Sequence, residues 1–272
     1  MSLRLQFRPV KKGAQGGLRH LGKEMILRRA PGLFWSYVRL RHGFLEPEMV
    51  LLPDLCRRDR TSVDVGANDG IYSYYLLKYS SGCIAFEPHP HLAQTLRQGL
   101  GHRVRVIEAA LSDRQGTSIL REVTFRPGLS TIEPENPISR IDEHPHSVRE
   151  VAVRVLRLDD LATGPLGFMK IDVEGHEAAV LSGSMATLRR DLPTLLLELE
   201  DQRRPRCREE VQALLAPLGY SGFFLHRERL RPLSAFDPRL FQNQDRPDLY
   251  IRNFIFLPEN RMSPFASRIQ RD

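Results

Sequence analysis

Short apolar runs alternate with amphipathic stretches along most of the chain. The runs predict strands at residues 61–65, 82–87, 104–112, 151–157, 167–172, 193–200, 222–226 and 253–257. The stretches between them have helical length and spacing at residues 46–58, 71–77, 89–100, 176–190 and 206–218. Strands that alternate with helices, followed by an irregular pair of strands at the end, predict an α/β fold with a doubly wound sheet.

A glycine-rich turn follows the first predicted strand, in the sequence T-S-V-D-V-G-A-N-D-G at Thr61–Gly70. A strand, a tight turn and a helix together bring the backbone and a helix N-terminus against a ligand. The spacing is not the G-x-G-x-x-G of dinucleotide-binding folds, and Asp64 stands two residues before the first glycine. A carboxylate at this place favours a ligand with positive charge and hydroxyl donors. S-adenosylmethionine, with its ammonium, sulfonium and ribose hydroxyls, meets that description.

Acidic residues lie at the carboxyl ends of several predicted strands, where open α/β sheets bind their ligands. They are Asp64, Glu87, Glu108, Asp172 and Glu198. Glu87 ends the second strand, the usual place of an acid that binds ribose hydroxyls, although it could instead cap the next helix. The stretch from Glu108 to Ala110 is expected on the adenine side. The chain contains no G-x-x-x-x-G-K-[ST] for ATP and no G-x-S-x-G for hydrolysis.

A second dense group of polar residues follows the strand at 167–172, in the sequence K-I-D-V-E-G-H-E. Two-residue alternation on a strand points Lys170, Asp172 and Glu174 to one side. A neutral imidazole is the usual base near pH 7, so His176 is the first candidate to take a proton from an acceptor hydroxyl, with Asp172 or Glu174 orienting it.

Two alternatives to this assignment stay open. Oxygen ligands suit Mg²⁺, so a divalent metal could be held by Asp172 with Glu198 or Glu200. We favour a site without metal. The second alternative is purely structural: Asp172 or Glu174 caps the helix that follows, and His176 forms hydrogen bonds with the backbone of its first turn.

The positive charge of the chain is concentrated at its N-terminus. Residues 1–45 contain ten Lys or Arg and one Glu, a formal charge of +9, whereas the whole chain carries +7. We therefore divide the chain into a basic arm, 1–45, and a domain, 46–272, and nucleic acid becomes an unlikely partner of the domain. The apolar positions of 20–45 favour a helical lid over a segment that contacts a membrane surface or an anionic partner.

The remaining features predict a cytoplasmic protein, with peripheral membrane contact through the arm as the alternative. Three widely spaced cysteines, Cys56, Cys83 and Cys207, argue against a disulfide framework or a zinc site. No run is long and apolar enough for a membrane span, and the N-terminus lacks the apolar core of a secretory signal. The oligomeric state has no indication in the sequence.

Several motifs in their order resemble the FkbM-type S-adenosylmethionine-dependent methyltransferases. They are S-V-D-V-G-A-N-D-G-I-Y-S, F-E-P, A-L-S-D-R-Q-G, R-L-D-D-L, F-M-K-I-D-V-E-G-H-E-A-A-V-L, L-L-L-E-L-E and N-F-I-F-L-P. The resemblance implies a class I methyltransferase fold, that is, a mostly parallel, seven-stranded Rossmann-like sheet with an antiparallel final strand. It also implies S-adenosylmethionine as methyl donor and O-methylation of a sugar, glycolipid or natural product.

The resemblance also assigns roles to single residues. Those that it places against the cofactor are Asp64, Gly66, Asn68, Gly70 and Glu87. To these we add Ser73, Glu108, Ala109 and Asp172 as expected cofactor-binding residues. Those that would face the acceptor are Lys170, Asp172, Glu174 and His176. Ser130, in G-L-S-T, matches a loop serine of the family where G-x-S-S is commoner. It lies in the long irregular stretch 122–150, which we expect to shape the acceptor pocket together with the N-terminal segment.

Two other functions compete with O-methylation. The first is an RNA or protein methyltransferase that uses the basic arm, although the chain has no N-P-P-Y for amino-group methylation. The second is a non-catalytic protein that binds S-adenosylmethionine or another metabolite. Acids at every predicted strand end argue against this second alternative.

Overall fold

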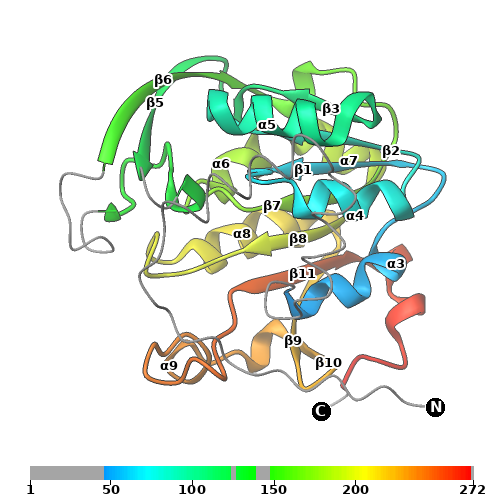
Figure 1. Ribbon diagram of the computed structural model, residues 1–272. Helices are drawn as coiled ribbons and strands as arrows, with labels where there is room; N and C mark the ends of the chain where they lie inside the picture. Colours follow the sequence, from blue (N-terminus) through cyan, green and yellow to red (C-terminus); the bar gives the residue numbers. More distant parts are fainter. Residues whose placement is uncertain (1–45, 124–126, 139–147, 271–272) are drawn as a thin grey trace.

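Eight strands form one twisted sheet across the middle of the molecule (Figure 1). The computed structural model describes residues 46–123, 127–138 and 148–270. The order of strands is β10 (Arg229–Pro232), β9 (Tyr220–His226), β11 (Asn253–Pro258), β8 (Thr194–Glu198), β7 (Leu166–Ile171), β1 (Thr61–Val65), β2 (Gly82–Phe86) and β3 (Val104–Ile107). The neighbours from β3 to β8 pair in parallel, and β11 runs antiparallel to both β8 and β9.

This architecture confirms the predicted Rossmann-like sheet, which is mostly parallel and has an antiparallel final strand, β11. The number of strands differs from the expected seven, because β10 adds an eighth strand at one edge, in a hairpin with β9. The hairpin turns at Arg227 and Glu228, which both have positive φ. Tight hairpins usually have Asn or Gly at these positions. Because this chain has Arg and Glu there instead, the turn had no signal in the sequence.

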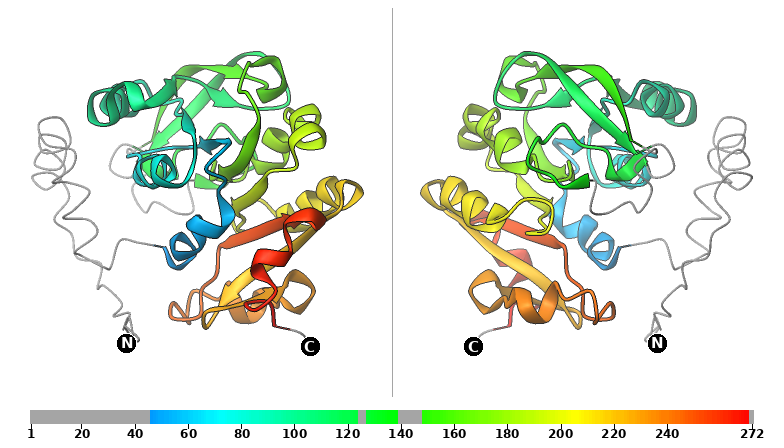
Figure 2. Two further views of the ribbon diagram at one scale, coloured as in Figure 1. Left: turned by 90° about the vertical axis from the view of Figure 1, so that its right-hand side faces the viewer. Right: turned by 90° about the vertical axis from the view of Figure 1, so that its left-hand side faces the viewer.

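A second, three-stranded sheet was not expected. Its order is β4 (Ala110–Leu111), β6 (Val148–Leu156) and β5 (Gly116–Val123). The run at 104–112, predicted as one strand, divides at Glu108–Ala109, so that β3 joins the main sheet and β4 the second one. The predicted strand at 151–157 also joins the second sheet. In both views of Figure 2 this sheet (green) lies at the end of the molecule opposite β9 and β10 (orange).

Helices cover both faces of the main sheet, as expected of a doubly wound fold. One core cluster joins Val63 and Val65 of β1 to α6 (Glu177–Ser182), α7 (Met185–Asp191) and α8 (Cys207–Leu215). The cluster on the other face packs against α3 (Leu52–Leu55), α4 (Ile71–Tyr79) and α5 (Pro90–Leu100). The remaining short helices are α9 (Pro238–Phe241), η2 (Pro47–Leu51), η3 (Gly101–Arg103), η4 (Pro127–Leu129), η7 (Leu158–Asp160), η8 (Ala216–Leu218), η9 (Leu233–Ala235), η10 (Glu259–Arg261) and η11 (Ser263–Phe265).

The helix predicted at 176–190 is divided into α6 and α7 at Gly183. A Cβ at this glycine would lie 1.9 Å from the carbonyl oxygen of Ser112. The second sheet therefore approaches the body so closely that only glycine fits here.

The predicted arm, residues 1–45, lies outside the described residues. In the part of the chain that is described, no helix is both long and apolar enough to cross a membrane.

Candidate active site

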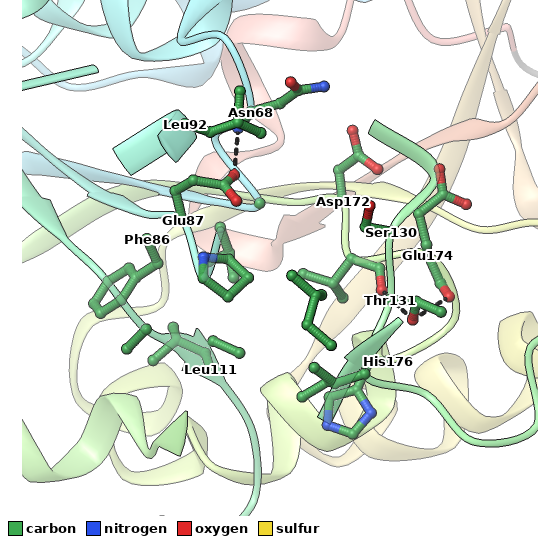
Figure 3. A pocket seen from close by; sticks show the side chains of 18 of the residues that line it. Asn68, Phe86, Glu87, Leu92, Leu111, Ser130, Thr131, Asp172, Glu174 and His176 are labelled. Carbon is green, nitrogen blue, oxygen red and sulfur yellow. Dashed lines mark hydrogen bonds between the residues drawn. The ribbon is translucent and has the colours of Figure 1, made fainter. Parts of the chain in front are cut away.

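A pocket opens at the carboxyl ends of β1, β2 and β7 (Figure 3). Strand-end turns of the main sheet line it, together with residues of β5 and of the stretch 128–132. Figure 3 shows Glu87 on one side of the pocket and Asp172, Glu174 and Ser130 on the other. The pocket thus lies where ligands bind in open α/β sheets.

The glycine-rich turn forms the part of the pocket after β1. Gly66 and Gly70 have φ of +75° and +84°, and Asn68 between them has φ of +49°. A Cβ at Gly66 would lie 1.9 Å from the carbonyl oxygen of Asp172. Glycine is therefore required at position 66 for two reasons: the positive φ, and the close approach of the turn after β7.

Glu87 is buried at the end of β2 and is held by backbone amides. Its Oε2 accepts from the N–H of Asn68 at 2.7 Å, and its Oε1 accepts from the N–H of His89 at 2.9 Å. Burial raises the pKa of Glu87 to about 7, against the lowering effect of these two hydrogen bonds. The N-cap of α5 is His89, whose side chain accepts from the N–H of Leu92. Glu87 is therefore not the N-cap of this helix.

Asp64 and Ser73, both predicted to hold the cofactor, lie behind the pocket wall and contact each other. The Ser73 hydroxyl donates to Asp64 Oδ2 at 2.6 Å, and both side chains are fully buried. Burial raises the pKa of Asp64, while the nearby charge of Lys170 opposes that rise. Direct contact of this pair with a cofactor stays a prediction, and the hydrogen bond supports the turn from behind.

Ala109 and Glu108 were predicted together, but the structure separates them. Ala109 and Ala110 line the pocket beside Phe86 and Leu111, which form an apolar slot suited to an adenine ring. The Glu108 carboxylate instead forms an ion pair with Arg97 at 2.9 Å and is 40% exposed. Glu108 therefore stands outside the set of residues that line the pocket.

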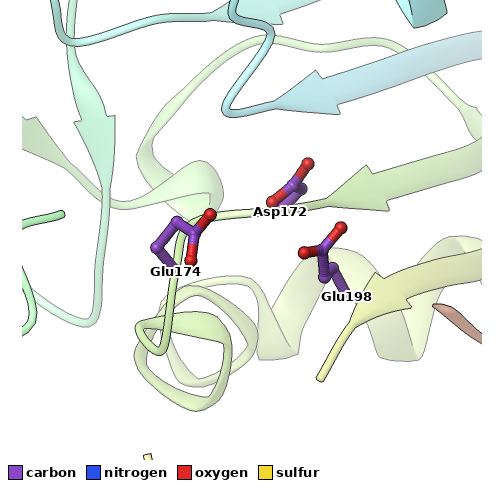
Figure 4. Close-up of side chains that lie close together, drawn as sticks. All are labelled: Asp172, Glu174 and Glu198. Carbon is purple, nitrogen blue, oxygen red and sulfur yellow. The ribbon is translucent and has the colours of Figure 1, made fainter. Parts of the chain in front are cut away.

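Three carboxylates gather at the ends of β7 and β8, and we call them the carboxylate cluster: Asp172, Glu174 and Glu198 (Figure 4). One oxygen from each lies within 4.8 Å of the others. Burial, and after it the charge of Asp172, raises the pKa of Glu174 to about 8 and that of Glu198 well above its usual value. Such an oxygen-rich group has the chemistry to hold Mg²⁺ or to contact acceptor hydroxyls.

Each member of the carboxylate cluster also has a basic partner. Lys170 lies 2.9 Å from Asp172, Arg203 lies 2.9 Å from Glu174, and Arg252 lies 3.5 Å from Glu198. The metal alternative named Glu200, whose carboxylate instead accepts from the Tyr250 hydroxyl at 2.5 Å. Glu174 takes the place of Glu200 in the cluster that the structure assembles.

Lys170 is buried between acids and an aromatic ring. Its Nζ lies 4.5 Å from the centre of the Tyr72 ring, and the Tyr72 hydroxyl donates to Glu46 at 2.5 Å. Burial by itself lowers the pKa of a lysine, but the charges of Asp172 and Asp64 outweigh it and raise the pKa of Lys170. The ammonium is therefore a permanent charge that orients Asp172.

His176 lines the pocket, but both of its ring nitrogens bind protein groups. Nδ1 lies 2.8 Å from Glu133 Oε2, and Nε2 lies 2.8 Å from the Ser112 hydroxyl. Sequence reasoning missed Glu133 and Ser112. Ser112 was assigned only to a strand, and Glu133 lay in the irregular stretch 122–150, so neither had a local pattern that would identify it.

Ser130 and Thr131 connect that irregular stretch to the pocket, and both line it. The Ser130 hydroxyl accepts from the N–H of Val123 at 3.1 Å, and the Thr131 hydroxyl donates to the carbonyl of Glu174 at 3.0 Å. The expected place of Ser130 at the pocket therefore agrees with its geometry, and its contact with an acceptor stays a prediction.

Comparison with known protein families finds one match, to the family described as the methyltransferase FkbM domain, over residues 64–225. The matched region contains the glycine-rich turn, Glu87, the second sheet and the carboxylate cluster. No curated protein matches the chain.

Solved structures with a similar arrangement include several methyltransferases. A methyltransferase FkbM from Methylobacillus flagellatus KT has a TM-score of 0.48 and 17% identity, covering 88% of this chain and 59% of its own. A methyltransferase from Streptococcus mutans in complex with SAH has a TM-score of 0.40 and 10% identity, covering 77% of this chain and 94% of its own. A tRNA methyltransferase from B. subtilis has a TM-score of 0.42 and 12% identity, covering 80% of this chain and 68% of its own.

These structural likenesses are too loose to carry an argument about substrate. The chain spans only about three fifths of the Methylobacillus flagellatus protein. The family assignment therefore rests on the match over residues 64–225.

Proposed function

The chain belongs to the FkbM methyltransferase family, and from that premise we propose that it is an S-adenosylmethionine-dependent O-methyltransferase. Its acceptor would be a hydroxyl group of a sugar, a glycolipid or a natural product. The observation that carries the proposal is that one pocket is lined by Glu87, at the end of β2, and by two members of the carboxylate cluster, Asp172 and Glu174, after β7. One acid suits the hydroxyls of a cofactor, and the others suit the hydroxyl of an acceptor.

The residues of the pocket fit the cofactor. Each Glu87 oxygen accepts one backbone N–H, and a carboxylate oxygen has a second lone pair that can accept a ribose hydroxyl. The slot at Ala109 and Leu111 is apolar, as an adenine ring requires. The turn from Gly66 to Asn68 lies against the backbone carbonyl of Asp172, so a ligand ammonium there would meet a hydrogen-bond acceptor. When bound, S-adenosylmethionine supplies an electrophilic methyl group on its sulfonium.

Asp172 is our first candidate to orient the acceptor hydroxyl and receive its proton. Its side chain lines the pocket and is one quarter exposed, and the Lys170 ammonium lies 2.9 Å from its carboxylate. His176, the first candidate from the sequence, becomes the second, because both of its nitrogens already bind protein groups. Lys170 and Glu174 are proposed to hold Asp172 and the acceptor in place rather than to take the proton.

Substitution of the two candidate bases tests this assignment. Asp172→Asn is expected to abolish most of the turnover while S-adenosylhomocysteine still binds in calorimetry. His176→Gln is expected to retain more turnover than Asp172→Asn. If His176→Gln is the inactive variant and Asp172→Asn turns over normally, the proton goes to the imidazole instead.

The acceptor is found most directly by a loss of methylation in cells. Mass spectrometry of extracts from a strain that lacks the gene is expected to show one hydroxyl-bearing metabolite or glycan without a methyl group of 14 mass units, an increment set by the formula CH₂ and reversed by the intact gene. If the missing methyl group is instead found on RNA or on a protein, the O-methylation of a small acceptor is wrong.

A further inference from the structure

A layer of chain that the proposed chemistry does not use lies over the pocket. It consists of strand β5 and the segment 127–138, which we together call the cover. Within the cover, Arg121 and Thr131 exchange two backbone hydrogen bonds. Leu120, Ser130 and Thr131 of the cover line the pocket together with the strand-end turns of the body.

The first contact between the cover and the body is a histidine–glutamate pair at the end of β5. His89 Nε2 lies 3.2 Å from Glu122 Oε1, with 15% and 6% of the two side chains exposed. His89 Nδ1 accepts from the N–H of Leu92 at 3.5 Å, which leaves Nε2 as the nitrogen that donates to Glu122. His89 follows Glu87 by two residues, so this pair fixes the cover to the turn that holds the cofactor-side acid.

The second contact is another histidine–glutamate pair, on the other side of the pocket. His176 Nδ1 lies 2.8 Å from Glu133 Oε2, and both side chains are buried. Two further side chains of the cover, Thr131 and Asn136, donate to the carbonyl of Glu174 at 3.0 Å and 2.6 Å. These bonds fix segment 127–138 to the turn after β7.

The third contact is steric. Gly128 lies against the side chain of Asn68, so that a Cβ at Gly128 would come within 2.7 Å of Asn68 Nδ2. The cover therefore touches all three strand-end turns that line the pocket, after β1, β2 and β7. A cofactor in contact with these turns would therefore also lie against the cover.

The two ends of the second sheet are attached to the body in different ways. At its root, β4 pairs with β6, and Leu111 and Leu158 are buried in the main core. Over the pocket, the described residues of 127–138 make no backbone–backbone hydrogen bond to the main-sheet body. Segments held by side-chain bonds rather than by sheet pairing and a shared core open at lower free energy than the rest of a fold.

We propose that Glu122 and Glu133 are positioning residues, which hold the cover shut over the cofactor pocket through His89 and His176. We call the His89–Glu122 and His176–Glu133 pairs the clasps. The cover opens when both pairs break, and the cofactor and its demethylated product exchange through that opening. The identity of what exchanges rests on the proposed function, whereas the opening does not. A closed cover excludes water from the reacting groups, and its opening sets the rate at which product leaves.

Hydrogen–deuterium exchange of the ligand-free protein tests the opening by itself. In the unaltered protein, the amides of Thr131, Glu133 and Asn136 are expected to exchange together and faster than those of β7 and β8. Glu133→Gln is expected to speed their exchange by about tenfold, the effect of losing roughly 1.4 kcal/mol of charge-assisted hydrogen bonding. Thr131→Val, which keeps the size of the side chain, is expected to act in the same direction. Glu150→Gln, at an exposed position on β6, is the matched control and leaves these rates unchanged.

Surface plasmon resonance with S-adenosylhomocysteine tests whether the opening controls exchange. Glu122→Gln and Glu133→Gln are each expected to speed its dissociation several-fold, and the double variant more, while Glu150→Gln dissociates like the unaltered protein. In turnover assays, the same variants are expected to raise KM for the cofactor more than they change the rate of the chemical step.

Two results would overturn the proposal. In the first, the amides of 127–138 exchange as slowly as those of β7, which means that the cover opens only when the whole protein unfolds. In the second, the clasp variants exchange faster but release S-adenosylhomocysteine at the unaltered rate. A protein that binds no S-adenosylhomocysteine at all contradicts the proposed function, and amide exchange then still decides whether the clasps hold a cover.

Discussion

Glu87 and the carboxylate cluster lie at the same edge of the main sheet, but different groups hold them. Two backbone N–H groups hold the Glu87 carboxylate, whereas side-chain cations hold Asp172, Glu174 and Glu198. Backbone donors fix a carboxylate as firmly as the strand ends themselves. Under the proposed function, the acid held by the backbone contacts the cofactor and the acids held by side-chain cations face the acceptor.

The largest effect is expected from Gly66→Ala, which disrupts both the glycine-rich turn after β1 and the strand end at Asp172. The φ of +75° disfavours alanine by about 1–2 kcal/mol, and the new Cβ would overlap the carbonyl of Asp172. Urea unfolding is expected to show a clear loss of stability, and calorimetry a loss of cofactor binding. Gly82→Ala is the control, because a Cβ there meets no atom within 4 Å. Normal binding by Gly66→Ala would show that the turn and the strand end do not form one site.

The second effect separates the two regions. Asp172→Asn is expected to lower kcat by roughly 100-fold or more, the usual contribution of a positioned acid or base. Its affinity for S-adenosylhomocysteine is expected to stay within about threefold, because Glu87 and the glycine-rich turn still hold that ligand. Steady-state kinetics and calorimetry on the same preparation measure both. Equal losses of kcat and affinity would mean that the two regions act as one.

The third effect is a dependence of cofactor affinity on pH. Burial raises the pKa of Glu87 to about 7, so its proton is bound below that pH and lost above it. Ribose hydroxyls need the ionised acceptor, and affinity is therefore expected to be constant at alkaline pH and to fall by up to about tenfold per unit below pH 7. Calorimetry from pH 5.5 to pH 9 measures it. Affinity that is flat across pH 7 would mean that Glu87 does not change its charge there or does not hold the ribose.

The smallest effect is expected from a metal chelator. Because Lys170, Arg203 and Arg252 already balance the carboxylate cluster, EDTA is expected to change turnover by less than about twofold. Turnover with and without EDTA, followed by addition of Mg²⁺, measures this. A loss of activity that Mg²⁺ restores would assign the cluster to a metal and leave the role of Glu87 untouched.

Much of the body could be predicted because its determinants are local in the sequence. The turn from Gly66 to Gly70 is defined by glycines at positive φ directly after a strand. Glu87 is recognisable because it ends the next strand. The direction of the strands then brings Asp172 to the same edge without further information.

The second sheet and its contacts could not be predicted, because they depend on long-range pairing. The run from Val104 to Leu111 contains neither Gly nor Pro where it divides between two sheets. The partners of His176 lie 43 and 64 residues away in the sequence. A histidine that is paired from such distances has the same local sequence as a free one, and only the fold distinguishes them.

Calorimetric titration of S-adenosylmethionine into the Glu87→Gln and Glu108→Gln variants tests the central claim most directly. The sequence places both acids at neighbouring strand ends, whereas in the structure only Glu87 lines the pocket and Glu108 pairs with Arg97. We expect Glu87→Gln to weaken binding by about tenfold or more, as for the loss of a charged hydrogen-bond acceptor, and Glu108→Gln to bind like the unaltered protein. Unchanged binding by Glu87→Gln would contradict the cofactor site described here.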